Sequence, residues 1–146
     1  DSQGLVSTND IDKIENRSVD YSPTAKPEKY IGEKVSFKRN IEKAKKCIVL
    51  ANYSCDLDKS HKSFIAKNNK PYMEAHHLIP LFAQEYFEYN LDVDANIISL
   101  CPNCHRKLHY GDNIYDDLKK LYDDRITYLQ KSGLNISFET LIDLYR

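Results

Sequence analysis

The strongest constraint in this sequence is where its metal-binding residue types stand. All four cysteines and all five histidines lie between Cys47 and His109, in less than half of a 146-residue chain. A chain of this length can bury an adequate core without disulfide bonds, and a disulfide-stapled scaffold would need more cysteines. We therefore expect reduced cysteines in a cytoplasmic protein, and a cluster that binds metal.

The cysteine spacing predicts a structural zinc site. Cys101 and Cys104 are separated by two residues, the spacing at which two thiolates bind one tetrahedral zinc ion at about 2.3 Å. Upstream stand Cys55, Asp58 and His61, so a third thiolate and either a carboxylate or an imidazole can complete the set. We favour His61, because imidazole with three thiolates is a common closed site. Four ligands leave no open position, so this zinc would hold the fold.

Two other interpretations of the cysteine pair remain open at this point. Followed by His105, the pair also forms the c-type haem attachment motif, and Cys-Pro-x-Cys resembles a redox dithiol. Neither explains why His76, His77 and His109 are present as well. Haem attachment also requires export, and no signal for export is visible.

The histidines predict a second metal site. If residues 105–109 are helical, His105 and His109 face the same way and can bind one ion. Adjacent residues on a strand point to opposite faces. One of His76 and His77 can therefore be a ligand while the other stays free as a base.

As a set, these motifs resemble the HNH endonucleases. The run from Tyr72 to Gly111 contains His-His-Leu-Ile-Pro, then Asn96, then Cys-Pro-Asn-Cys-His-Arg-Lys-Leu-His-Tyr-Gly. It is similar to the HNH cleavage domains of bacterial restriction enzymes, including McrA-type enzymes that cut modified DNA. Asp58 stands where many zinc-bearing relatives have a second cysteine. The resemblance implies an α+β fold, with a small ββα-metal, treble-clef-like core, a structural zinc knuckle and flanking helices.

The resemblance also implies roles for the histidines. His77 matches the general base, and Asn96 matches the central asparagine that orients the loop and the base. His76 and His105 match ligands of a catalytic divalent ion, and His109 matches the third ligand of histidine-rich members such as the colicin DNases. A histidine-rich site suits manganese, nickel or cobalt as well as magnesium.

The expected activity is metal-dependent hydrolysis of DNA, leaving 5′-phosphate and 3′-hydroxyl ends, in a restriction or defence enzyme. Neutral imidazole near pH 7 is a suitable acceptor for the proton of the attacking water. Arg106 is either a phosphate contact or an ordinary surface arginine. The alternative function is a zinc-stabilised nucleic-acid-binding module without cleavage activity. A module of that kind has no need for a spare base such as His77.

The charge and the start of the chain suggest its organisation. Residues 1–30 read as a linker or N-terminal arm, and 31–146 as the HNH domain. The net charge is −1, yet residues 31–75 hold ten Lys or Arg against five Asp or Glu, a net +5 that should face double-stranded DNA.

The chain begins at Asp1 without methionine, so we expect a longer protein with a recognition domain upstream. A dimer would serve double-strand cleavage, and no stretch reaches the ~20 apolar residues of a membrane span.

Hydrophobic periodicity gives the expected elements. Phe37, Ile41, Ala44, Ile48 and Ala51 form one helical face that begins after a Ser36 N-cap, with Cys47 beside it as a buried thiol. Strands are expected over 71–80 and 96–100. Helices are expected over 82–89, from residue 104, over 112–132 between Asp112 and Gly133, and over 137–145.

Overall fold

A short antiparallel strand pair forms the centre of the fold. The computed structural model describes residues 5–14, 16–30, 36–37 and 39–146. β3 (Glu74–His77) pairs with β4 (Ile97–Leu100) so that His76 lies opposite Ile98 and His77 opposite Ile97. All four residues of β4 are buried, whereas burial alternates along β3. The alternation places Glu74 and His76 on one face of the strand and Ala75 and His77 on the other.

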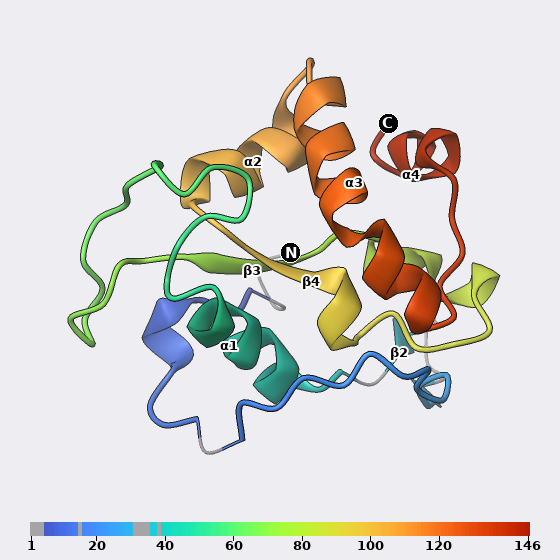
Figure 1. The fold of residues 1–146 in the computed structure, drawn as a ribbon, viewed down its shortest axis with the longest axis horizontal. Coiled ribbons are helices and arrows are strands. Elements are labelled where there is room, and N and C mark those ends of the chain that lie inside the picture. Colours follow the sequence, from blue (N-terminus) through green and yellow to red (C-terminus); the bar gives the residue numbers. More distant parts are fainter. Residues whose placement is uncertain (1–4, 15, 31–35, 38) are drawn as a thin grey trace.

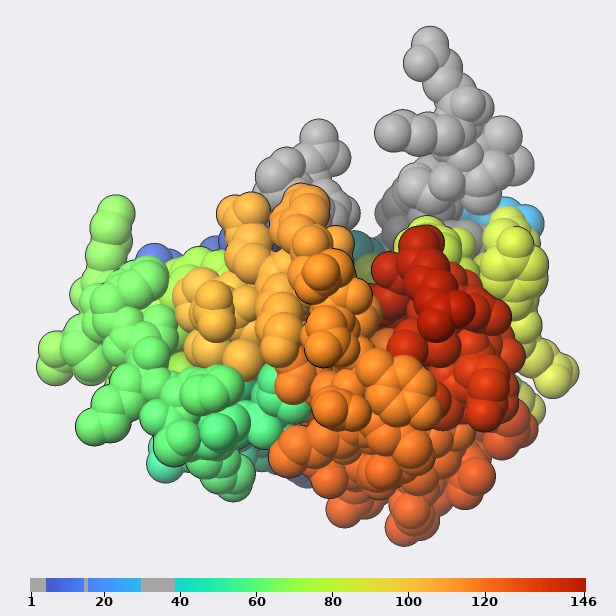
Figure 2. Space-filling view, turned by 90° about the horizontal axis from the view of Figure 1, so that it is seen from above, coloured from blue at the N-terminus to red at the C-terminus, as the bar shows by residue number. Residues whose placement is uncertain are grey.

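The described part of the chain forms four helices, and they lie on both sides of this pair (Figure 1). α1 (Ile41–Leu50) contacts both strands, as does α2 (Pro102–Tyr110), which follows β4 directly. In the view of Figure 1, α1 lies on one side of the strand pair, with α2 and α3 (Tyr115–Lys131) on the other. α4 (Phe138–Leu144) packs on α3, and α2 and α4 share the face drawn in Figure 2. The predicted α+β class with a ββα core and flanking helices is confirmed.

The start of α2 shows why the Cys-Pro-x-Cys sequence folds as it does. Cys101 is the N-cap of the helix, and its sulfur accepts a hydrogen bond from the backbone N–H of Cys104 at 3.4 Å. Pro102 occupies the first helical turn, where its missing N–H costs nothing. The sequence thus begins the helix and turns both sulfurs toward the same side.

The N-terminal arm packs against the core. Ser7 forms a β-bridge with Glu74, and the backbone N–H of Thr8, in η1 (Thr8–Asp10), donates to the carbonyl of Met73 at 3.0 Å. Val6 and Ile11 are buried. The boundary predicted at residue 30 adjoins residues 31–35, which lie outside the described part of the chain, and it stays a prediction.

Two predicted helix starts are wrong. Ser36 and Phe37 form β2 (Ser36–Phe37), which pairs with β1 (Lys29–Tyr30), and α1 instead starts after Asn40. The Asn40 side chain accepts from the N–H of Glu42 at 3.1 Å, because asparagine caps a helix as well as serine does. α3 likewise starts at Tyr115, without a side-chain cap from Asp112.

The remaining elements lie close to their predicted positions. The segment expected as an aromatic helix is the 3-10 helix η2 (Leu81–Tyr86), and a second one, η3 (Asp94–Asn96), precedes β4. Gly133 ends α3 with φ +76°, in close contact with the ring of Tyr89. No helix in the described part of the chain is long and apolar enough to cross a membrane.

Candidate metal centres and active site

The first metal cluster joins the start of α2 to the loop that precedes β3. The three sulfurs of Cys55, Cys101 and Cys104 and a ring nitrogen of His61 all lie within 4.8 Å of one another. The three cysteines are buried and no disulfide links them. His61 Nδ1 lies 3.2 Å from the Cys104 sulfur and 3.9 Å from that of Cys101. Three thiols and one imidazole form a donor set that can hold tetrahedral zinc.

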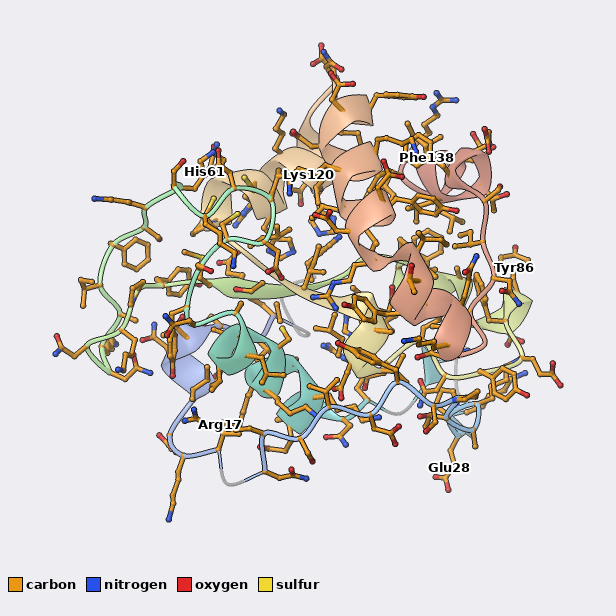
Figure 3. The ribbon with its side chains drawn as sticks, in the orientation of Figure 1. Arg17, Glu28, His61, Tyr86, Lys120 and Phe138 are labelled. Carbon is orange, nitrogen blue, oxygen red and sulfur yellow. The ribbon has the colours of Figure 1, made fainter. Side chains whose placement is uncertain are left out.

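The geometry distinguishes the two residues considered for the fourth position. Figure 3 shows His61 on its loop beside α2. Asp58 lies on the outer side of that ring, with Oδ2 3.5 Å from Nε2, the nitrogen that faces away from the sulfurs. The other oxygen of Asp58 accepts from Ser60 N–H and Oγ at 2.9 and 2.6 Å, which lowers the pKa of this exposed carboxyl. The structure therefore brings His61 into the cluster and places Asp58 behind it.

Cys47 lies apart from the cluster, on the buried face of α1, as predicted. Burial raises the pKa of its thiol, and the nearby charge of Asp56 adds to the effect. Cys47 is not among the donors that converge in the cluster, and a buried free cysteine of this kind packs as a small hydrophobic side chain.

The second cluster consists of His76 from β3 and His105 and His109 from α2. One ring nitrogen of each lies within 4.8 Å of those of the other two. The Nε2 atoms of His105 and His109 are 3.1 Å apart, and two ligands bound at about 2.1 Å to one ion lie about 3.0 to 3.4 Å apart. Burial, and then the neighbouring His105, hold the pKa of His76 well below its ordinary value, and partial burial and His105 also lower that of His109. A lowered pKa favours the neutral, metal-binding form of the His76 and His109 imidazoles.

Two partners outside the cluster fix the ring orientations. Glu74 Oε1 accepts a hydrogen bond from His105 Nδ1 at 2.8 Å, which leaves Nε2 directed at the cluster. This bond, with a second from Tyr72, lowers the pKa of the Glu74 carboxyl against the effect of burial. His76 Nε2 lies 2.7 Å from the hydroxyl of Tyr145, which donates to the carbonyl of Leu78. His76 is thus the donor to Tyr145, and its Nδ1 is left free.

His77 points to the other face of β3 and stays outside the cluster. Its Nε2 lies 2.8 Å from Asp92 Oδ1, and both side chains are more than 90% buried. The second oxygen of Asp92 accepts from the backbone N–H of Asn40 at 2.5 Å. Burial alone would raise the pKa of Asp92, but the bonds from His77 and Asn40 and the charges of His77 and Arg39 together lower it. Asp92 is therefore a carboxylate that holds the ring of His77.

Asn96 is fully buried and does not contact the histidine cluster. Its side chain accepts from Ile79 N–H at 2.7 Å and donates to the carbonyls of Ile79 and Leu91 at 3.0 and 2.9 Å. Its backbone carbonyl accepts from Leu78 N–H at 2.9 Å. These bonds link the end of the loop between β3 and β4 to its start, directly after His77, and to Leu91, which precedes Asp92. Asn96 thus fixes the loop that carries the partner of His77.

A pocket of about 360 Å³ opens beside the histidines, with His76, His77, His105 and His109 in its wall. The exposed aromatic ring of Phe82 from η2 lines its rim. Tyr86 of the same element projects to solvent at the edge of the molecule (Figure 3). Arg106 is exposed on α2 and does not line this pocket.

Comparison with known proteins agrees with this geometry. Residues 58–111 match the HNH endonuclease family. A stretch of 77 residues is 38% identical to the type IV methyl-directed restriction enzyme EcoKMcrA of Escherichia coli strain K12. This stretch makes up 53% of this chain and 26% of that enzyme. The match thus spans about a quarter of the relative. Residues 58–111 are thus similar to an HNH domain, with a McrA-type relative, and both clusters draw residues from this segment.

Several residues of the site carry no signal in the motifs. Tyr145 and Arg39 reach it from outside the run Tyr72–Gly111, Asp92 lies within that run but in none of its motifs, and only the fold shows all three. Glu74 could have been found, because strand alternation places it on the face of His76.

Proposed function

We propose that this domain is a metal-dependent endonuclease that hydrolyses DNA phosphodiester bonds. One observation carries the proposal: His77 is held by Asp92 beside a pocket where three other histidines converge. Three ligands and a separate base are the parts that phosphodiester hydrolysis requires. A module that only binds nucleic acid needs no such base.

The donor set fits a divalent ion at His76, His105 and His109. Two Nε2 atoms face each other at 3.1 Å, and Glu74 fixes the ring of His105. Imidazole ligands suit manganese, nickel and cobalt, and magnesium is acceptable where water and phosphate oxygens complete its shell. A bound ion supplies positive charge that stabilises the phosphate and the departing 3′-oxygen. We propose a structural zinc ion at Cys55, His61, Cys101 and Cys104, with four protein ligands and no open position.

The residues of the chain itself do the proton chemistry. His77 donates Nε2–H to Asp92, so its other ring nitrogen is the proton acceptor. That nitrogen takes a proton from water as the water oxygen bonds to phosphorus and the bond to the 3′-oxygen breaks. The products are a 5′-phosphate and a 3′-hydroxyl, whose proton comes from solvent. The Asp92 carboxylate keeps the ring in this orientation and stabilises the imidazolium that forms.

The substrate and the setting follow from the relative. That enzyme is by name methyl-directed, and we propose double-stranded DNA, selected for a modified base by a separate domain, as the substrate here. Such an enzyme would serve restriction or defence in the cytoplasm, and a dimer would cut both strands. Segment 31–75, with its net charge of +5, favours contact with the phosphate backbone.

Nicking of supercoiled plasmid tests the proposal. The wild-type chain should convert supercoiled to open-circular DNA with manganese or nickel, and cleavage of an end-labelled duplex should give 5′-phosphate and 3′-hydroxyl ends. His77→Ala should remove the activity. A folded, zinc-loaded wild type that never nicks DNA with any divalent ion would favour the zinc-stabilised binding module instead.

A further inference from the structure

Arg39 is the one arginine or lysine among the described residues that line the histidine pocket. It is half-buried and lies directly before Asn40, the N-cap of α1. Arg106, the arginine that the sequence motif suggests, lies outside that wall. A permanently charged guanidinium beside His77 is a feature that neither the HNH motif nor the pocket histidines require.

The Nε atom of Arg39 is buried and has no hydrogen-bond acceptor among the described residues. Buried donors in folded proteins are nearly always paired, and an unpaired one at a functional site calls for an explanation. Asp92, whose pKa the charge of Arg39 helps to lower, is already engaged by His77 and Asn40. The side chain of Arg39 as a whole is half-buried and lines the pocket, so an acceptor that enters the pocket from outside the chain can reach the accessible part of the guanidinium.

Backbone contacts fix the point at which the Arg39 side chain leaves the chain. Asn40 N–H donates to one oxygen of Asp92 while His77 donates to the other. One carboxylate therefore ties the backbone next to Arg39 to the ring of His77. The backbone next to Arg39 and the base are thus anchored to the same carboxylate before any substrate arrives, which favours a preorganised site.

We propose that Arg39 binds the phosphate of the DNA strand that is cut. The planar guanidinium offers parallel N–H donors that match two phosphate oxygens, which a lysine cannot do. Arg39 then holds the phosphate over the pocket while His77 activates the water. This assignment rests on the proposed endonuclease function for its catalytic part, but phosphate binding by Arg39 can be tested without cleavage.

The first arm measures binding without divalent metal. A short DNA duplex is titrated into the zinc-loaded wild type, Arg39→Ala, Arg39→Gln and the matched control Arg17→Ala, which removes an exposed arginine of the N-terminal arm. Loss of one phosphate contact should make the negative slope of log K against log salt shallower by about 0.9 in both Arg39 variants, while Arg17→Ala keeps the wild-type slope. An unchanged slope in the Arg39 variants would overturn the proposal, whether or not the wild type cleaves DNA.

The second arm measures plasmid nicking with manganese. Arg39→Ala should lower kcat/KM by about 10- to 100-fold, Arg39→Lys should recover only part of this, and low millimolar guanidinium should restore activity to Arg39→Ala but not to His77→Ala. Circular dichroism and bound zinc should match the wild type in every variant. A wild type that binds DNA through Arg39 but never nicks would refute the endonuclease function and leave this contact standing. Loss of activity in Arg106→Ala with full activity in Arg39→Ala would assign the contact to Arg106 and overturn the proposal.

Discussion

The two candidate metal clusters of this chain use the same helix in different ways. Cys101 and Cys104 at the start of α2 face the loop that carries His61, while His105 and His109 on the following turns face β3. The first cluster has four donors, three of them sulfur, and the second has three nitrogens beside an open pocket. A complete tetrahedral shell suits a structural ion, whereas a partial shell leaves positions for water and phosphate. Ligand number, more than residue type, separates the two roles.

The comparison also predicts that the histidine cluster depends on the cysteine cluster, and not the reverse. α2 is positioned at its start by the cysteine cluster, and the same helix delivers two of the three histidines. Loss of the first cluster should therefore disturb the second. Loss of the second should leave the first intact, because none of its histidines contacts the sulfurs within the described structure.

The largest effect should follow removal of a sulfur. Cys104→Ser should abolish zinc binding and unfold the domain, since structural zinc in small domains contributes on the order of 10 kcal/mol of apparent folding free energy. Zinc content by elemental analysis and thermal unfolding by circular dichroism measure this. His109→Ala is the control, and it should keep both zinc and fold. A folded, zinc-free Cys104→Ser protein would show that the cluster does not hold the fold.

The next effect separates base from ligand. His77→Ala should lower the nicking rate by about 100- to 10,000-fold and leave manganese affinity nearly unchanged, because His77 lies outside the ligand set. His105→Ala should weaken both. Calorimetric titration beside the nicking assay distinguishes them. Our assignment is wrong if His77→Ala loses the metal while His76→Ala retains it.

A smaller loss of metal affinity is expected when Glu74, the hydrogen-bond partner of the proposed ligand His105, is changed. Glu74→Gln keeps the shape of the side chain but removes the carboxylate that accepts from His105 Nδ1. Loss of such a partner typically costs about 10- to 100-fold in metal affinity, and zinc content should not change. The matched control is Tyr72→Phe, which removes the hydrogen bond to the other oxygen of Glu74 and leaves the His105 contact in place. Equal losses of manganese affinity in both variants would argue against a specific role for the Glu74–His105 contact.

The smallest effect concerns the fourth zinc position. Asp58→Ala should retain a full equivalent of zinc, because Asp58 meets only the outer nitrogen of His61 and is exposed. His61→Ala should bind zinc far more weakly, which a competition titration with a colorimetric chelator can measure. Zinc loss in Asp58→Ala with retention in His61→Ala would reverse this assignment.

The sequence predicts which histidines and cysteines converge better than it predicts the partners that orient them. Fixed spacing on one helix brings His105 and His109 together, and strand alternation separates His76 from His77, so local periodicity is sufficient for both. The contact of Asp92 with His77 spans 15 residues and that of Tyr145 with His76 spans 69. Such contacts depend on how loops and helices pack, which no local pattern encodes.

The misplaced start of α1 has a similar cause. Ser36 and Asn40 are both acceptable N-caps. The choice is made by tertiary contacts: residues 36–37 pair with β1, and Asn40 N–H bonds to Asp92. The same contacts place Arg39 at the pocket, so the residue proposed to bind phosphate could not be found from the motif.

The most direct test of the account is a metal count combined with activity on one sample. Dialysis against a mild chelator should leave one zinc ion per chain and an unchanged circular dichroism spectrum, with no nicking. Addition of manganese should restore nicking and bind one further ion, and His105→Ala should fail to bind it. The account is contradicted if folded protein contains no zinc, or if nicking persists after the exchangeable ion has been removed.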